Sequence, residues 1–375
     1  MALPIAAAFD GMTDPRAETA NKLHALTDIL AIATCAVIAG AEGWEQIAEY
    51  GRRKEAFFRR FLKLGNGVPS HDTFYRVFAA LDPAAFAERF GRWMAAACAG
   101  AGLTPVAIDG KSVRGAKRAN ATGCLCVVSA WATANGVTLG QVAVPDGTSE
   151  IGVVPDLLRA LDLAGAVVTA DAAGCQTENA RVIRERGGHY LLAVKGNQEG
   201  LHDAVRDAFD RAIAAEFAGV ACDTHAAEED GHGRHEERYV TVIYDPAGLP
   251  PDWPDAAAIV LVGRERSVKG KNTSTAHYYI TSLRGTAAEL AGLVRGHWGI
   301  ENGLHWVLDV GFREDRSRTR DLNAGANLAL LRRVAVSLLK AATKKGSIHT
   351  RRLAAGWDDE FMLEVLQGLP SVHSA

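Results

Sequence analysis

The first hundred residues carry apolar side chains at the spacing of amphipathic helices. Apolar positions recur every three or four residues there, as at Leu26 and Ile29. Ser70 or Asp72 is a candidate N-cap for one of the later helices. We therefore expect a helical domain over residues 1–103. Such a bundle is a common way to hold DNA, and it is equally common as a plain structural domain.

After residue 104 the pattern changes to short apolar runs of strand length, separated by turn residues and two helical stretches. Strands are expected over 105–108, 126–132, 137–144, 167–170 and 190–194, with helices from about 150 and over 177–186. The glycine and basic residues that follow Asp109 suit a loop. This order predicts an α/β fold with a ribonuclease H-like catalytic core, whose first part spans 104–198. In that core the first and fourth strands lie side by side.

A second change of pattern interrupts this core. Residues 199–285 begin with a polar helix and then contain several strand-like runs, which favours a mainly β insertion. A helical stripe resumes near Ala287, and its three- and four-residue steps predict that Glu301 lies on the packed face. Residues 286–375 are expected to hold this final core helix and a basic, helical C-terminal region.

Three acidic residues lie where a two-metal site is expected. Asp109 and Asp171 each end a strand-like run, and α/β sheets collect their chemistry at the carboxyl ends of strands. Glu301 lies in the final helix, where a lone charge on a packed face needs compensation. Carboxylates are the hard oxygen ligands that paired Mg²⁺ ions require. The sequence therefore predicts a site for two Mg²⁺ ions, for which Mn²⁺ can substitute. A strand-end acid that caps a loop is the alternative for either aspartate taken alone.

Several polar side chains are candidate DNA contacts, each with a structural alternative. Lys111 lies two residues past Asp109 and is either a phosphate contact or an exposed loop lysine. Gln176 follows Asp171 and either touches a nucleotide or caps the next helix. The complete set of candidates is Lys111, Arg114, Gln176, Lys195, Arg295, His297, Asn302, His305, Arg332 and Arg333.

Histidine and tryptophan side chains surround Glu301 on the final helix. His297 and His305 flank Glu301 at four-residue spacing, so they either orient it, bond to DNA or pack the helix. Trp298 and Trp306 can stack on unpaired bases, although core packing is the stronger expectation for both.

The net charge of −3 over 375 residues hides two basic segments and one acidic segment. Residues 313–352 hold eleven basic and three acidic residues, and residues 52–63 hold six basic and one acidic residue. Residues 216–260 hold ten acidic residues against Arg234 and Arg238. Basic segments of this kind neutralise DNA phosphates, and the acidic segment is expected to face away from them. A solvated helix face remains the alternative for either basic segment.

Cysteine usage and hydropathy exclude several other classes of protein. The six cysteines form no CxxC pair, which favours reduced packing residues over disulfides or a zinc site. No uninterrupted apolar stretch reaches membrane-spanning length, and residues 1–14 do not resemble a secretory signal. We expect a soluble protein in the cytoplasm with no membrane partner.

The chain resembles the DDE transposases of bacterial insertion sequences, specifically the subgroup of H-repeat-associated proteins, over nearly its whole length. The most specific part is His297-Trp298-Gly299-Ile300-Glu301-Asn302, followed by the run from Leu304 to Val310. Other matching segments are 28–30, 43–44, 66–74, 107–111, 171–176, 193–198 and 232–234.

The resemblance implies that Asp109, Asp171 and Glu301 form the catalytic triad, and that the N-terminal helical region is typical of the family. His297 replaces the arginine that the wider group usually has four residues before the glutamate, and Arg295 is the candidate for its phosphate contact.

The expected function is DNA transposition: metal-dependent strand cleavage at the ends of a mobile element, followed by strand transfer to target DNA. A hydrolytic nuclease of the same fold and a non-catalytic, transposase-derived DNA-binding protein are the alternatives. The expected partners are double-stranded DNA, with terminal inverted repeats and a target site, and a second copy of the chain. We expect at least a dimer on DNA, located at the bacterial nucleoid.

Overall fold

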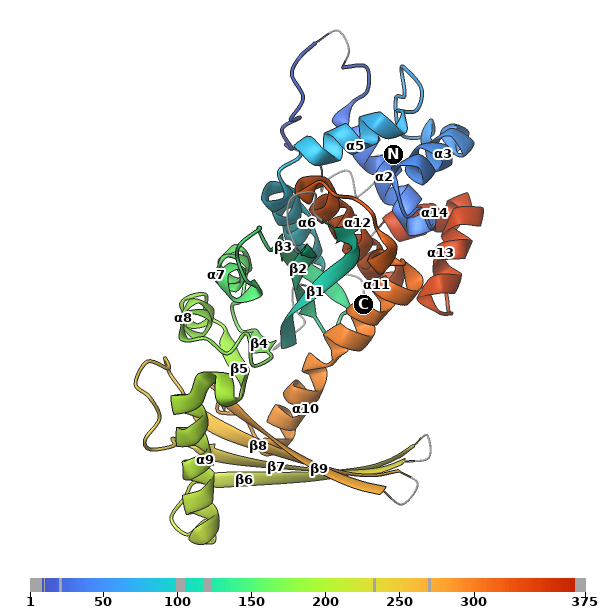
Figure 1. Cartoon of the computed structure of the whole chain (residues 1–375). Helices are drawn as coiled ribbons and strands as arrows, with labels where there is room; N and C mark the ends of the chain where they lie inside the picture. Colours follow the sequence, from blue (N-terminus) through green and yellow to red (C-terminus); the bar gives the residue numbers. More distant parts are fainter. Residues whose placement is uncertain are drawn as a thin grey trace. The chain divides into compact units, whose positions relative to one another are not determined.

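The computed structural model describes residues 9, 11–19, 22–98, 105–117, 123–231, 234–268 and 271–367 (Figure 1). The chain divides into two compact units. Unit 1 comprises Met1–Ala101, Gly110–Val153 and Ile300–Ala375, and unit 2 comprises Gly102–Asp109 and Val154–Gly299. The predicted domain limits at 103, 198 and 285 differ from the limits of these two units. The predicted domains stay predictions.

Unit 1 is mainly helical. Its helices are α2 (Leu26–Ala39), α3 (Trp44–Arg53), α4 (Glu55–Phe58), α5 (His71–Ala80), α6 (Pro83–Cys98), α11 (Trp306–Gly311), α12 (Leu322–Ala341), α13 (Ile348–Trp357) and α14 (Asp359–Leu366). Ser70 is the N-cap of α5, because its side chain accepts a hydrogen bond from the Thr73 amide. The sequence had named Ser70 as one of two candidates for this cap.

Helix α12 is the centre of unit 1. Every residue from Ala324 to Leu339 is buried, because the helix contacts α2, α5 and α6 as well as two strands. Two short turns precede it, η2 (Glu301–His305) and η3 (Glu314–Arg316). A helix with this environment buries its charged residues together with its apolar ones.

Three strands complete unit 1. Strand β1 (Pro105–Lys117) contributes its part from Gly110 onward, and β2 (Cys124–Ala132) and β3 (Val137–Ala143) form an antiparallel hairpin. The hairpin turns at Gly136, whose φ of +68° favours glycine. The strand order in this unit is β3-β2-β1.

Unit 2 contains a mixed sheet that begins with the first five residues of β1. The other strands are β4 (Val167–Ala170), β5 (His189–Val194), β6 (Cys222–Gly231), β7 (Arg234–Tyr244), β8 (Ala258–Val268) and β9 (Lys271–Thr281). Their order is β1-β4-β5-β9-β8-β7-β6, in which β1, β4 and β5 are parallel and the later pairs are antiparallel. The α/β class and the side-by-side placement of the first and fourth strands are confirmed.

In the described residues, four helices and a short turn accompany this sheet. They are α7 (Glu150–Ala160), whose first four residues belong to unit 1, α8 (Thr177–Glu185), η1 (Gly196–Gln198), α9 (Glu199–Ala214) and α10 (Ala287–His297). Ala287, Leu290 and Val294 of α10 belong to one hydrophobic cluster with Val240 and Val260 of the antiparallel strands. Figure 1 shows α10 beside these strands. Apolar burial of this kind fixes α10 to the insertion that precedes it.

Two elements differ from the prediction. The residues after Asp109 form no loop, because β1 continues to Lys117 with Val113 and Ala116 buried in near alternation with exposed residues. Strand β6 escaped prediction because its acidic sequence contains only Thr224 of the β-branched and aromatic side chains that usually mark a strand.

Among the described residues, no single helix is long and apolar enough to cross a membrane, although α2 and α3 together, bent by 98°, meet that length and composition.

Candidate active site

Asp109 and Asp171 leave the sheet of unit 2 at neighbouring points. Strands β1 and β4 are parallel, and Ile108 pairs with Ala170 in their register. Asp109 is the next residue of β1 and Asp171 directly follows the last residue of β4. Adjacent strands lie about 4.8 Å apart. Both carboxylates therefore start from the same edge of the sheet, as the sequence predicts.

The loop after Asp171 is built around its own carboxylate. Asp171 Oδ1 accepts hydrogen bonds from the backbone amides of Ala173 and Gly174, at 3.0 and 3.1 Å. Gly174 is required at its position, since a Cβ atom there would lie 2.6 Å from the Ala170 Cβ. The side chain of Asp171 is exposed, so its orientation is fixed while it remains open to a ligand.

Side-chain amides from neighbouring elements hold the same loop. Asn197 Nδ2 donates to the Ala172 carbonyl at 2.8 Å, and Gln198 Nε2 donates to the Cys175 carbonyl at 2.9 Å. Gln198 Nε2 also lies 3.0 Å from Gln176 Oε1, so Gln176 is engaged within the loop. Asn197 and Gln198 were missed as positioning residues. The available signal was the pair of adjacent amide side chains, Asn197 and Gln198, which follows Lys195 and Gly196 after β5, the neighbour of β4.

His297 lies at the end of α10 and belongs to unit 2. Its Nδ1 is 3.0 Å from the hydroxyl of Thr169, the residue two before Asp171. Burial lowers the pKa of His297, and the negative charge of Asp171 acts in the opposite direction. The ring is therefore mainly neutral at pH 7. Arg295 forms an ion pair with Glu229 at 2.8 Å, while Lys195 is exposed just before η1.

Glu301 begins a π-helical turn, η2, in unit 1. A π turn holds an extra residue relative to an α-helix, and such turns are frequent at functional sites. Ile300 is buried and Glu301 is exposed, so the prediction that Glu301 lies on the packed face is wrong. The simple helical spacing did not include the shift that this turn introduces.

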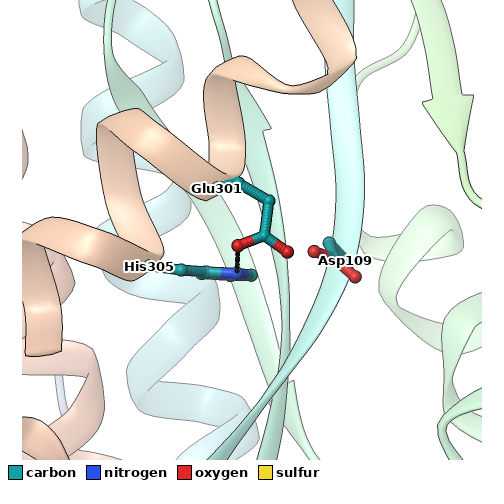
Figure 2. A group of neighbouring side chains, drawn as sticks. All are labelled: Asp109, Glu301 and His305. Atoms are coloured by element: carbon teal, nitrogen blue, oxygen red, sulfur yellow. Dashed lines mark ion pairs between the residues drawn. The ribbon is translucent and has the colours of Figure 1, made fainter. Parts of the chain in front are cut away.

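His305 ends the same turn and supports Glu301. Its Nδ1 lies 3.7 Å from a Glu301 carboxylate oxygen, and its ring is buried (Figure 2). Figure 2 also draws Asp109, which ends the unit 2 part of β1. Each of the three side chains offers an atom that can bind a metal ion. Carboxylate oxygens are the kind of ligand that Mg²⁺ and Mn²⁺ prefer, whereas an imidazole beside a carboxylate suits an orienting role.

Three of the candidate DNA contacts are buried in an ion-pair cluster of unit 1. Lys111 is 7% exposed and its Nζ lies 2.7 Å from an oxygen of Asp309. Arg332 and Arg333 are 2% and 0% exposed, and Arg333 lies 2.9 Å from an oxygen of Glu314. The prediction that these three side chains face DNA is wrong, because the packing of α12 and β1 encloses them. Arg114 and Asn302, in contrast, are exposed.

Trp298 and Trp306 do not pack in the core. Their exposed fractions are 59% and 61%, so the expectation of core packing is wrong for both. Large exposed aromatic rings beside an acidic site are suited to stacking on bases.

Comparison with known proteins identifies the family. Residues 100–338 match the model of the "Transposase DDE domain", and residues 6–94 match the model described as "DDE_Tnp_1-associated". The chain belongs to the DDE transposase family, which confirms the resemblance seen in the sequence.

Relatives from two bacteria cover most of the chain. The "H repeat-associated putative transposase YhhI" of Escherichia coli K12 is 35% identical over 92% of this chain and 93% of its own length. An "Uncharacterized protein in dhlA 3'region" of Xanthobacter autotrophicus is 43% identical over 73% of this chain and 92% of its own. A solved structure of the piggyBac transposase synaptic complex with hairpin DNA aligns over 99% of this chain and 79% of its own, at 10% identity and a TM-score of 0.44.

Proposed function

We propose that this protein is a DNA transposase that cleaves the ends of a mobile element and joins the freed 3′-hydroxyl to target DNA. Asp109, Asp171 and Glu301 would hold two Mg²⁺ ions, which activate the attacking oxygen and stabilise the leaving oxygen. The observation that carries this proposal is the parallel pairing of β1 and β4, which starts two carboxylates from one sheet edge.

The surrounding residues supply positioning. The amides of Ala173 and Gly174 orient Asp171, and Asn197 anchors the loop that carries it. His305 holds the carboxylate of Glu301, and the neutral ring of His297 adds no positive charge that would compete with bound cations. Loss of such supporting contacts typically costs about 10- to 100-fold in metal affinity or activity.

We infer that at least two copies assemble on DNA, because one acidic triad provides one active site and an element has two ends. Terminal inverted repeats are the expected recognition sequences, and each protomer would act at one of them.

The proposal is tested with Asp171→Asn. The change keeps the size of the side chain and removes the charge that binds metal, so Mg²⁺-dependent nicking of an element-end duplex should fall by at least about 100-fold. Binding of the same duplex without metal should stay near that of the wild type, as should both properties of Asp207→Asn, an exposed control on α9. Nicking by Asp171→Asn at the wild-type rate would exclude the metal-ligand role.

A second assay separates the two enzymatic candidates. A pre-cleaved end with a labelled 3′-hydroxyl should become joined to a target plasmid if the protein is a transposase. Cleavage without joining would favour the hydrolytic nuclease.

A further inference from the structure

Unit 1 contains a cavity of about 680 Å³ with a strongly cationic lining. The lining residues are Gly115, Lys117, Asp315, Arg316, Arg318 and Arg320. Four of these six residues are basic, and Asp315 is the single acid. The cavity lies where the last residues of β1 meet the segment between η3 and α12.

The backbone under these cations is fixed at both ends. Asp315 Oδ1 accepts a hydrogen bond from the Arg114 amide at 3.1 Å, which attaches the segment to β1. Asp321 caps α12 by accepting from the Ala324 amide at 2.8 Å. Gly115 lies directly under the segment, since a Cβ atom there would lie 2.6 Å from the Ser317 carbonyl oxygen and would also overlap the Asp315 carbonyl. The cations therefore project from a rigid base.

The segment carries its arginines at alternate positions, and all three are exposed. Ser317 is buried, whereas Arg316, Arg318 and Arg320 are exposed, and residues 317–320 have no helical structure. The exposed arginines alternate with the buried Ser317 and the half-buried Thr319. All three line the same cavity as Lys117, which gathers a short row of cations in one place.

In the part of the chain that the structure describes, the side chains of these cations are not paired with acids. Within the described part of the chain, no ion pair or hydrogen bond involves the side chain of Lys117, Arg316, Arg318 or Arg320. The basic segment 52–63 differs, because five of its six cations lie within ion-pair distance of an acid. Those pairs are Arg52 and Arg53 with Glu49, Lys54 with Asp359, Arg59 with Glu55, and Arg60 with Glu360. Among the described residues, the cavity therefore concentrates positive charge, with Asp315 as the single acid in its lining.

We propose that this cavity binds the phosphodiester backbone of duplex DNA without reading its sequence. Guanidinium groups bind phosphate oxygens in bidentate fashion, and a row of fixed cations suits a repeating polyanion. The assignment to DNA, rather than to an acidic protein segment, rests on the proposed function. It also moves the expected DNA contact from the buried Arg332 and Arg333 to an open site on the same basic stretch.

The test measures how DNA affinity depends on salt, in the absence of divalent metal. The variant Arg316→Gln/Arg318→Gln/Arg320→Gln removes three cations, and each phosphate contact contributes about 0.9 to the slope of log K against log salt. The slope should fall by about 2 to 3, equally for an element-end duplex and a scrambled duplex. The matched control, Arg181→Gln/Arg206→Gln/Arg211→Gln on α8 and α9, loses the same charge from an exposed surface and should keep the wild-type slope. Arg316→Lys/Arg318→Lys/Arg320→Lys should restore most of the slope, because it restores the charge.

An unchanged slope in the glutamine variant would overturn the proposal. Polyglutamate serves as the probe for an acidic protein partner. If the glutamine variant kept its slope for DNA but no longer bound polyglutamate, the proposal would also be overturned and the cavity would be assigned to an acidic protein partner. An equal loss in the control variant would show a general effect of net charge and would also overturn it. The measurement of binding does not depend on cleavage. If the wild-type protein bound DNA without nicking it, that result would contradict the proposed function, while the salt dependence would still test the cavity.

Discussion

Two groups of cations in unit 1 come from the same basic stretch of sequence and from β1, yet they have opposite environments. Lys111, Arg332 and Arg333 are enclosed around the buried carboxylate of Glu314. The row formed by Lys117 and the arginines 316, 318 and 320 lines an open cavity with one acid. Both groups consist of basic residues from the same segments of the sequence. The local net charge therefore predicts neither which cations are buried nor which ones bind a ligand.

The comparison indicates what a buried, paired cation and an exposed, unpaired cation each contribute to the protein. A buried cation costs several kcal/mol of desolvation and is tolerated when a partner compensates it, so the enclosed group contributes a fixed geometry. An exposed, unpaired cation costs little to hold and is available to a polyanion. The first group is therefore structural and the second is the better candidate for a DNA contact.

The largest effect is expected when the central acid of the enclosed group is neutralised. Glu314→Gln leaves Arg333 and its neighbours without the charge that compensates them, and breaking a buried pair typically costs about 3 to 5 kcal/mol. The free energy of unfolding, measured in urea, should fall by that amount. The control Asp359→Asn breaks a more exposed pair with Lys54 and should cost less than about 1 kcal/mol. A loss below about 1 kcal/mol for Glu314→Gln would mean that the enclosed cluster is not structural.

The parts of the site that sequence predicts are those that depend on local periodicity. Asp109 and Asp171 could be placed side by side because the strands around them have clear apolar runs and a familiar order. The exposure of Glu301 could not be predicted, since it follows from a π turn that leaves no mark in the spacing of apolar residues. The burial of Arg332 and Arg333 could not be predicted either, because it depends on elements that pack around α12 from distant parts of the chain.

A smaller difference in the free energy of unfolding is expected between substitutions of one lysine from each group. Lys111→Met removes an ammonium that lies 2.7 Å from Asp309, 3.4 Å from Asp315 and 3.9 Å from the fully buried Glu314. The carboxylates of the cluster then lose a compensating charge. A loss of about 1 to 3 kcal/mol in unfolding free energy is expected. Lys117→Met, in the open cavity, should change stability by less than about 0.5 kcal/mol. Equal losses for the two variants would contradict the distinction between the groups.

The smallest effect concerns an exposed cation that does have partners, His235 of β7 in unit 2. Hydrogen bonds with Glu237 and Asp230, at 3.0 and 2.8 Å, raise the pKa of His235 to about 9 from a usual value of 6.5. Because the folded-state pKa is the higher one, the stabilising contribution is fully present below pH 6.5 and is lost as pH rises through 9. An NMR titration of the His235 ring should place its midpoint near 9. In Asp230→Asn/Glu237→Gln the midpoint should move back toward 6.5, with little change in the unfolding temperature, because the site is exposed to solvent. A midpoint near 6.5 in the wild type would show that exposed carboxylates do not hold a cation in this protein, and would strengthen the contrast with the enclosed group around Glu314.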